Sequence, residues 1–127
     1  MIYTVTFNPS IDYIVSVDEF ELGKTNRTTK EWMLPGGKGL NVSTERYNLG
    51  VPNTALGFMA GFVGTEVKRL AEENGYICDF IEIKNGISRI NVKLKDFDGT
   101  EINGMGPEID EEALQQLMNR LNGLKKG

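Results

Sequence analysis

The sequence contains no histidine and only one cysteine, Cys78. A single thiol cannot form an intrachain disulfide, and a lone thiol without histidine argues against a structural zinc site. The same two shortages argue against Cys-His and Ser-His nucleophilic catalysis. An excess of positive charge is also missing. The net charge of −4 gives no electrostatic reason to expect nucleic acid or an anionic membrane as a partner.

Long apolar runs are missing too. No run approaches the roughly 18 residues that a membrane helix needs. The first residues, 2–7, have the pattern of a strand rather than of a signal peptide. We therefore expect a cytoplasmic protein with no membrane partner. The 127 residues, 39% of them hydrophobic and 25% charged, are enough for one globular domain and short for two.

Part of the chain has the pattern of alternating buried strands and helices. Apolar segments at 2–7, 54–59 and 78–83 indicate strands, and segments 40–49 and 66–74 indicate helices that end at glycine. Residues 61–64 are expected to form a turn, with Thr65 as the N-cap of the second helix. This order predicts a parallel βαβαβ layer. A last helix should begin at the N-cap Asp110, with Leu114, Leu117 and Leu121 on one apolar stripe.

The segments 11–17, 28–34 and 88–103 have a different pattern, in which apolar and polar residues alternate. Ser88 to Leu94 is the clearest case, and Asp98-Gly99 predicts a hairpin that leads back through 100–103. These segments predict an antiparallel sheet with one face in water. The predicted fold is α/β: a partial Rossmann-like parallel sheet with helices, together with an antiparallel β-sheet lid.

The most distinctive motif, Pro35 to Asn41, reads PGGKGLN and lies at a junction between a loop and a helix. Free backbone N–H groups and the helix dipole favour an anion at such a junction. Lys38 would add positive charge, and Asn41 offers both a donor and an acceptor. The spacing fits neither GxxxxGK(S/T) nor a complete GxGxxG motif. The alternative interpretation is a flexible turn before a helix.

Two other positions are candidates for ligand contacts. Asp12 closely follows the first strand, at the end where α/β sheets place ligands. It could contact sugar hydroxyls or be a simple turn aspartate. Arg89 could pair with a phosphate or be a solvated strand arginine. On local grounds, Lys24 and Arg27 are solvated loop charges.

Several segments, in order along the chain, resemble the N-terminal portion of the ribokinase-like (PfkB) carbohydrate kinases, in particular the 1-phosphofructokinase and tagatose-6-phosphate kinase branch. They are MIYTVTFNPSID at 1–12, PGGKGLNVS at 35–43, LGVPNTALGF at 49–58, SRINVKLK at 88–95, EING at 101–104 and GPEI at 106–109. The resemblance implies a phosphorylated ketohexose as substrate, and ATP with Mg²⁺ as cofactors of the full-length family. It also implies substrate contacts by Asp12, Gly36, Gly37, Lys38, Gly39 and Asn41. Arg89 and Lys24 would hold the phosphorylated end.

The sequence departs from the family in lacking its catalytic Gly-Ala-Gly-Asp motif. We therefore expect no catalytic residue, no metal ligand and no bound cofactor in this chain alone. The expected function is that of the N-terminal substrate-binding and lid part of an ATP-dependent ketohexose-phosphate kinase of the fructose 1-phosphate or tagatose 6-phosphate type, inactive when isolated. The alternatives are a non-enzymatic dimerisation module, an engineered fragment of such a kinase, or one half of a split enzyme.

The expected organisation is a single truncated domain over 1–127. Its α/β body would comprise about 1–10, 35–86 and 104–127, and its lid about 11–34 and 87–103. Relatives in this family often pair through their lids, so we expect a homodimer through the lid or through an exposed sheet edge. Glu45 and Arg46 stand where relatives usually carry apolar residues. Because burying an unpaired charge is costly, both side chains should be exposed or paired.

Overall fold

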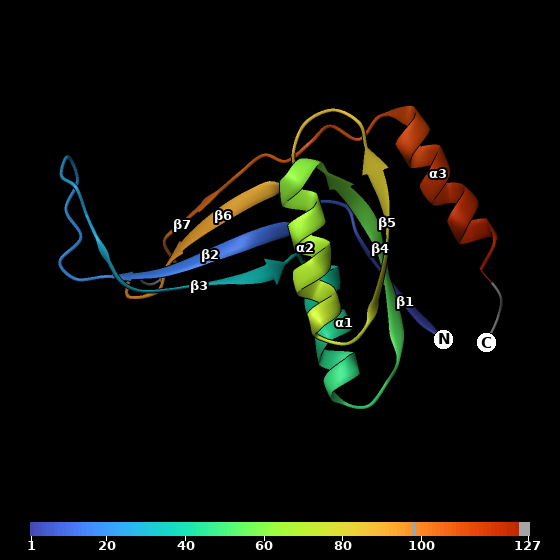
Figure 1. The fold of residues 1–127 in the computed structure, drawn as a ribbon, viewed down its shortest axis with the longest axis horizontal. Helices are drawn as coiled ribbons and strands as arrows, with labels where there is room; N and C mark the ends of the chain where they lie inside the picture. Colours follow the sequence, from blue (N-terminus) through green and yellow to red (C-terminus); the bar gives the residue numbers. More distant parts are fainter. Residues whose placement is uncertain (98, 125–127) are drawn as a thin grey trace.

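The computed structural model describes residues 1–97 and 99–124. Strands β1 (Ile2–Thr6), β4 (Asn53–Ala60) and β5 (Ile77–Ile83) form a parallel sheet in the order β1-β4-β5. Helix α1 (Lys38–Asn48) lies between β1 and β4 in the chain, and α2 (Gly61–Glu73) lies between β4 and β5 (Figure 1). The predicted parallel layer is confirmed.

The two faces of this sheet carry separate cores because successive side chains of a strand point to opposite faces. On one face, Ala55 and Cys78 pack with residues of α1 and α2, among them Leu40 and Val67. On the other face, a second cluster packs against α3 (Glu111–Asn122). Its buried members are Leu56, Phe58, Ala60, Ile81, Ile83, Ala113 and Leu117.

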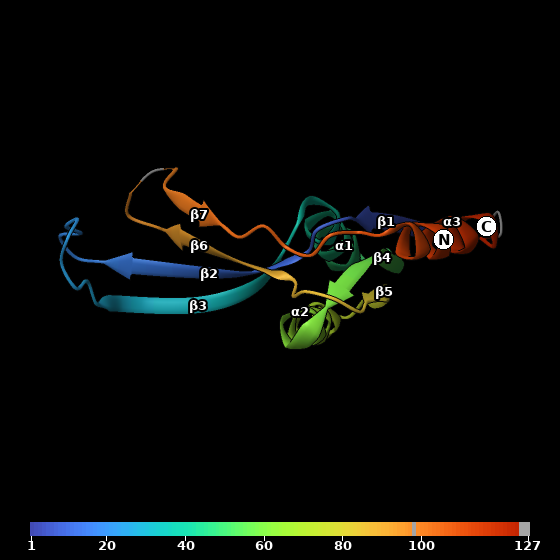
Figure 2. The ribbon, with the colours of Figure 1, turned by 90° about the horizontal axis from the view of Figure 1, so that it is seen from above.

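The second sheet is the lid, made of β2 (Ser10–Val17), β3 (Thr28–Gly36), β6 (Arg89–Leu94) and β7 (Glu101–Asn103) in the order β3-β2-β6-β7. It extends away from the α/β body as a long arm (Figures 1 and 2). The prediction of a wholly antiparallel lid needs correction, because the central strands β2 and β6 pair in parallel. These two strands follow β1 and β5, which are themselves parallel, and they leave the body in the same direction.

The outer pairs of the lid, β2 with β3 and β6 with β7, are antiparallel as predicted. Within the predicted hairpin turn, Asp98 lies outside the described residues.

The start of α2 was predicted wrongly. The helix begins at Gly61, without a turn at 61–64, and the Thr65 hydroxyl donates to the Gly61 carbonyl oxygen at 3.3 Å instead of capping the helix. The glycines at 61 and 64 are needed for close packing. A Cβ atom at Gly64 would lie 2.8 Å from the Met59 Cβ. Glycines in a sequence signal tight approach as well as turns, and the local pattern does not separate the two.

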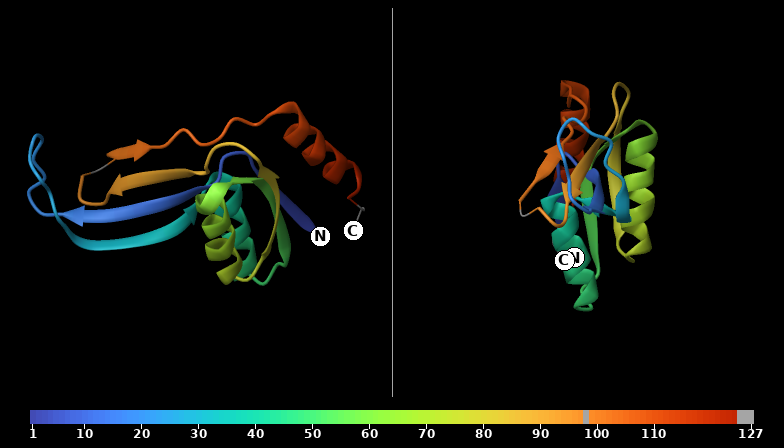
Figure 3. Two further views of the ribbon diagram at one scale, coloured as in Figure 1. Left: turned by 45° about the horizontal axis from the view of Figure 1, so that its top comes forward. Right: turned by 90° about the vertical axis from the view of Figure 1, so that its left-hand side faces the viewer.

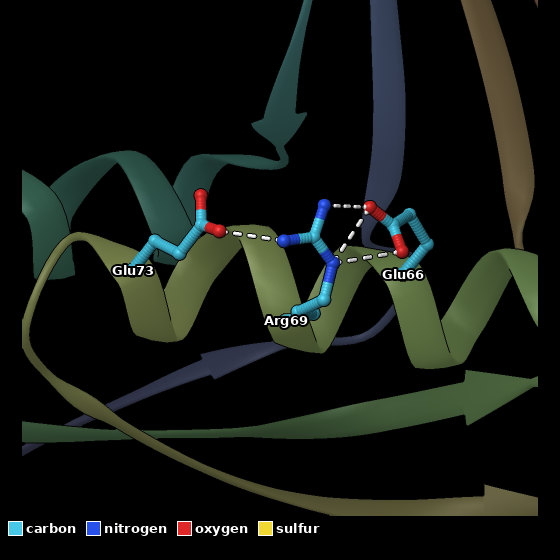
Figure 4. A network of polar contacts seen from close by, with 3 residues as sticks. All are labelled: Glu66, Arg69 and Glu73. Carbon is cyan, nitrogen blue, oxygen red and sulfur yellow. Dashed lines mark hydrogen bonds and ion pairs between the residues drawn. The ribbon is translucent and has the colours of Figure 1, made fainter.

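The exposed face of α2 carries a network of charges, shown in Figure 4. Arg69 lies between Glu66 and Glu73, with its Nε 2.9 Å from Glu66 Oε1 and its Nη1 2.5 Å from Glu73 Oε1. Hydrogen bonding to Arg69 lowers the pKa of the Glu66 carboxyl. Pairs at these helical spacings support the helix and keep this face solvated.

Helix α1 is held to the sheet by polar contacts more than by an apolar stripe. Leu40 and Ser43 are its buried residues. The Ser43 hydroxyl lies 2.6 Å from that of Thr4, and the Asn53 side-chain amide donates to the Ser43 carbonyl oxygen at 3.0 Å. Glu45 and Arg46 are exposed, as predicted.

Helix α3 begins as predicted, with Asp110 Oδ1 accepting a hydrogen bond from the Ala113 N–H at 2.8 Å. The predicted apolar stripe needs correction, because Leu114 is 42% exposed while Ala113 and Leu117 are buried. The helix packs mainly on β5 and β4, so only a narrow stripe is covered. None of the helices in the described part of the chain has the length and apolarity that a membrane crossing needs.

Candidate functional site

A polar cleft of about 230 Å³ lies between the lid and the N-terminus of α1. Residues from widely separated segments meet there. The lining residues are Asp12, Gly37, Lys38, Asn41, Arg89, Asn91, Lys93, Glu101 and Asn103. The cleft thus brings together five of the eight predicted substrate contacts, while Gly36 and Gly39 are chain neighbours of its lining.

The glycine loop allows α1 to begin directly at the cleft. Gly37 has a φ of 118°, a conformation that a residue with a Cβ adopts only with strain. A Cβ at Gly36 would lie 2.4 Å from Asp12 Oδ2, and one at Gly39 would lie 2.1 Å from Thr6 Oγ1. The N-cap position has no side-chain hydrogen bond. First-turn N–H groups of α1 are therefore available to an anion.

Asp12 is the centre of a hydrogen-bonded network. It is 8% exposed, and its Oδ1 accepts hydrogen bonds from Ser10 Oγ at 2.7 Å and from Asn91 Nδ2 at 3.1 Å. Its Oδ2 lies 3.2 Å from Lys93 Nζ. A buried carboxylate with donors to both oxygens is held in a fixed orientation, as a carboxylate that binds hydroxyl groups must be.

Arg89 is anchored by the segment that follows β1. Its Nε donates to the Asn8 carbonyl oxygen at 3.1 Å, and the Asn8 side-chain amide donates to the Met105 carbonyl oxygen at 3.0 Å. These bonds join residues from three parts of the chain at the edge of the cleft. They orient the guanidinium group, which is suited to bidentate binding of phosphate.

The charge in the cleft differs in sign from that of the whole chain. Lys38, Arg89 and Lys93 contribute positive charge, and Asp12 and Glu101 contribute negative charge. The cleft therefore carries a positive balance in a chain whose net charge is −4. Such a site can bind a small anion that also carries hydroxyl groups.

Lys24 is the predicted site residue that the structure does not bring to the cleft. It lies in the loop between β2 and β3, where its Nζ is 2.6 Å from Glu21 Oε2. That loop is at the end of the lid farthest from the α/β body (Figure 3). Lys24 is therefore not part of the cleft that Arg89 lines, and its contact with the phosphorylated end of a substrate stays a prediction.

Sequence reasoning missed Asn91, Lys93 and Glu101 as cleft residues, and it assigned no ligand role to Asn103. The signal for the first two was present, because Arg89, Asn91 and Lys93 share the polar face of β6. That face was predicted to be in water, whereas it faces the cleft. Among the described residues, no group of three or more His, Cys, Asp or Glu side chains is placed to hold a metal ion.

No protein-family model matches the chain. The sequence is 46% identical over 127 residues to 1-phosphofructokinase of Bacillus subtilis, and the match covers all of this chain and 42% of the relative. It is 39% identical to D-tagatose-1-phosphate kinase of Bacillus licheniformis, again over all of this chain and 41% of the relative. The chain thus spans about two-fifths of the length of the curated relatives that it matches.

The chain also resembles solved structures of phosphofructokinases. A candidate phosphofructokinase from Staphylococcus aureus has a TM-score of 0.88 at 43% identity, over 98% of this chain and 40% of the other. Phosphofructokinase-2 of Escherichia coli, solved with fructose-6-phosphate, has a TM-score of 0.82 at 24% identity, over 99% of this chain and 42% of the other, and supports the fold alone.

The parallel α/β layer with its projecting β-sheet lid has the fold of the ribokinase-like (PfkB) carbohydrate kinases, and the chain is similar in sequence to part of the length of members of that family. Within the family, it resembles the N-terminal portion of the 1-phosphofructokinase and tagatose-6-phosphate kinase branch.

Proposed function

We propose that this chain is the substrate-binding and lid part of an ATP-dependent ketohexose-phosphate kinase of the fructose 1-phosphate or tagatose 6-phosphate type. The observation that carries the proposal is the cleft itself. It unites a fixed carboxylate, the N-terminus of a helix and three cationic side chains. A phosphorylated sugar needs this combination, because it presents hydroxyl groups and a phosphate at once.

The cleft residues take distinct roles in this proposal. Asp12 accepts hydrogen bonds from sugar hydroxyls, and Asn41 adds a further polar contact. The phosphate binds near Arg89 and Lys38, where the N-terminus of α1 adds a favourable dipole. The lid covers the sugar and limits access of water, which protects a phosphoryl donor from hydrolysis. A cytoplasmic location would accompany this function.

ATP and Mg²⁺ would supply the phosphoryl group and its charge neutralisation in the whole enzyme. The described residues offer no carboxylate cluster for Mg²⁺, and the sequence has no Gly-Ala-Gly-Asp motif. We propose that this chain's residues hold the sugar phosphate rather than the nucleotide. We expect the isolated chain to bind the substrate weakly and to catalyse no transfer, because positioning and charge stabilisation of the phosphoryl group would both be missing.

Calorimetric titration of the purified chain with fructose 1-phosphate, fructose 6-phosphate and tagatose 6-phosphate tests the binding. Arg89→Ala should weaken binding about 10-fold or more, because a hydrogen bond to a charged group is lost. Arg46→Ala is the matched control, since Arg46 is exposed on α1 and does not line the cleft. Equal affinity of both variants would contradict the proposed site.

A second measurement tests the catalytic part of the proposal. The purified chain is incubated with ATP, Mg²⁺ and each sugar phosphate, and ADP formation is followed. Turnover by the chain alone would refute the expected inactivity. If the chain is one half of a split enzyme, activity should appear only after a separate C-terminal half is added.

The outer face of the lid favours a second role in self-association. Strand register places Met33, Tyr13, Val92 and Ile102 in one row across all four strands, on the face opposite Asp12 and Asn91. Met33 is 56% and Ile102 is 70% exposed. We propose that this row mediates a homodimer, which would also be the function of the chain if it is only an interaction module.

Sedimentation at several concentrations, with and without sugar phosphate, measures this association. Ile102→Lys should dissociate a dimer formed through the lid, because it places a charge in the apolar row. Ile77→Lys changes an equally apolar residue, 62% exposed on the edge strand β5. Dissociation by Ile77→Lys alone would assign the contact to the sheet edge. A tight dimer whose dissociation constant does not change when sugar phosphate is added would favour the interaction module over the kinase part.

A further inference from the structure

Asn91 has an unusual position for an amide on a lid strand. It lies in β6 with only 5% of its surface exposed, and it is paired with Asp12 of β2 and with Asn103 of β7. Its Nδ2 donates to Asp12 Oδ1 at 3.1 Å, and its Oδ1 accepts from the Gly104 N–H at 3.1 Å. A carboxylate only accepts and a backbone N–H only donates. Both contacts therefore require the same orientation of the amide.

The two oxygens of Asp12 have different surroundings as a result. Oδ1 is held by two buried donors, Ser10 Oγ and Asn91 Nδ2. Oδ2 lies 3.2 Å from Lys93 Nζ, and the Lys93 side chain is 40% exposed. A flexible, half-exposed ammonium group is easily exchanged for another donor, whereas buried donors are not. Oδ1 therefore fixes the carboxylate, and Oδ2 is the oxygen that a hydroxyl can share or take over.

We infer that Asn91 is a positioning residue, which holds the Asp12 carboxylate in the orientation that binds a sugar hydroxyl and ties this orientation to the lid segment at Gly104. The inference rests on the proposed function in that it takes Asp12 as the hydroxyl-binding group. Because the amide joins β2, β6 and the residue after β7, Asp12 keeps its orientation only while these parts of the lid are in place.

The Asn91→Asp variant tests this role without a large change in shape. It replaces the Nδ2 donor by an oxygen next to Asp12 Oδ1, and two carboxylates so close cannot both be ionised. Binding of fructose 1-phosphate at pH 8 should weaken about 10-fold or more and should recover as the pH falls towards 5 and the pair takes up a proton. Lys38, Arg89, Lys93 and Glu101 also face the cleft, so the charge of the variant needs a matched control.

Asn103→Asp provides that control. It adds the same negative charge to the cleft lining at the cross-strand partner of Asn91 and also creates a close carboxylate pair, but with Glu101 Oε1, to which the asparagine donates at 3.0 Å, and not with Asp12. Recovery of binding at low pH should be much smaller in this variant. Asn91→Thr, which removes the amide without adding a carboxylate, should weaken binding by a similar factor at every pH.

A readout without ligand separates this inference from the proposed function. The Asp12 carboxyl carbon is followed by NMR from pH 3 to 8, with backbone spectra to show that each variant is folded. In Asn91→Asp the close carboxylate pair should take up its proton at a higher pH than Asp12 does in Asn103→Asp. Equal titrations in the two variants, or full binding by folded Asn91→Thr, would overturn the inference. If the unmodified chain binds no sugar phosphate but the titration moves as expected, the proposed function fails and the positioning role stands.

Discussion

Gly39→Ala sets two physical effects against each other. Gly39 lies in α1, where alanine is a better helix former than glycine by about 1 kcal/mol. The new Cβ would lie 2.1 Å from Thr6 Oγ1 and 2.8 Å from the Val5 carbonyl oxygen. The Thr6 side chain could adjust, but the Val5 oxygen belongs to the backbone of β1, which pairs with β4. Overpacking of this kind costs about 1–3 kcal/mol, so the steric effect should prevail.

Urea unfolding followed by circular dichroism measures the outcome. Gly39→Ala should lower the free energy of unfolding, and Thr6→Ala in the same chain should restore part of the loss because it removes the closest atom. Gly123→Ala is the control. Gly123 has a φ of −87°, and the new Cβ would lie 3.5 Å from the Asn119 carbonyl oxygen, which is an ordinary van der Waals contact, so no loss is expected. A Gly39→Ala chain as stable as the unmodified one would refute the close approach of α1 to β1. The variant should also bind fructose 1-phosphate more weakly, because Lys38 and Asn41 share its helical turn.

Two further substitutions should have smaller effects on the free energy of unfolding, and one chemical modification tests the burial of a thiol. Asp110→Ala removes the cap of α3, which is a 2.8 Å bond to the Ala113 N–H, and should lower the unfolding free energy by about 1 kcal/mol in the same urea assay; an unchanged value would mean that the cap contributes nothing. Arg120→Ala breaks the half-exposed pair with Asp79, 2.7 Å apart, and should cost less than about 1 kcal/mol, with a smaller effect in high salt. Burial raises the pKa of the Cys78 thiol to about 12. Iodoacetamide at pH 8 should therefore alkylate the folded chain far more slowly than the urea-unfolded chain, and equal rates would contradict its burial.

Local patterns in the sequence were sufficient to locate most elements. Period-2 alternation marked the strands, and the side chain of Asp110 marked the start of α3, because both signals depend on residues close in the chain. The glycine loop at 36–39 indicated a helix N-terminus near a ligand for the same reason. The start of α2 was missed because the close contacts that require glycine at positions 61 and 64 arise only in the folded chain. Gly61 lies against Ile87, and Gly64 lies against Met59.

The alternating residues of β6 are enough to predict one polar and one apolar face, but alternation does not say what lies against each face. The path of the folded chain brings the polar face of β6 to Asp12, and Asn91 and Lys93 become part of the cleft for that reason. The same path makes β2 and β6 run parallel and leaves Lys24 away from Arg89. Pairing between strands and charge contacts between distant segments depend on the path of the whole chain, whereas helices, strands and caps depend on a few neighbouring residues.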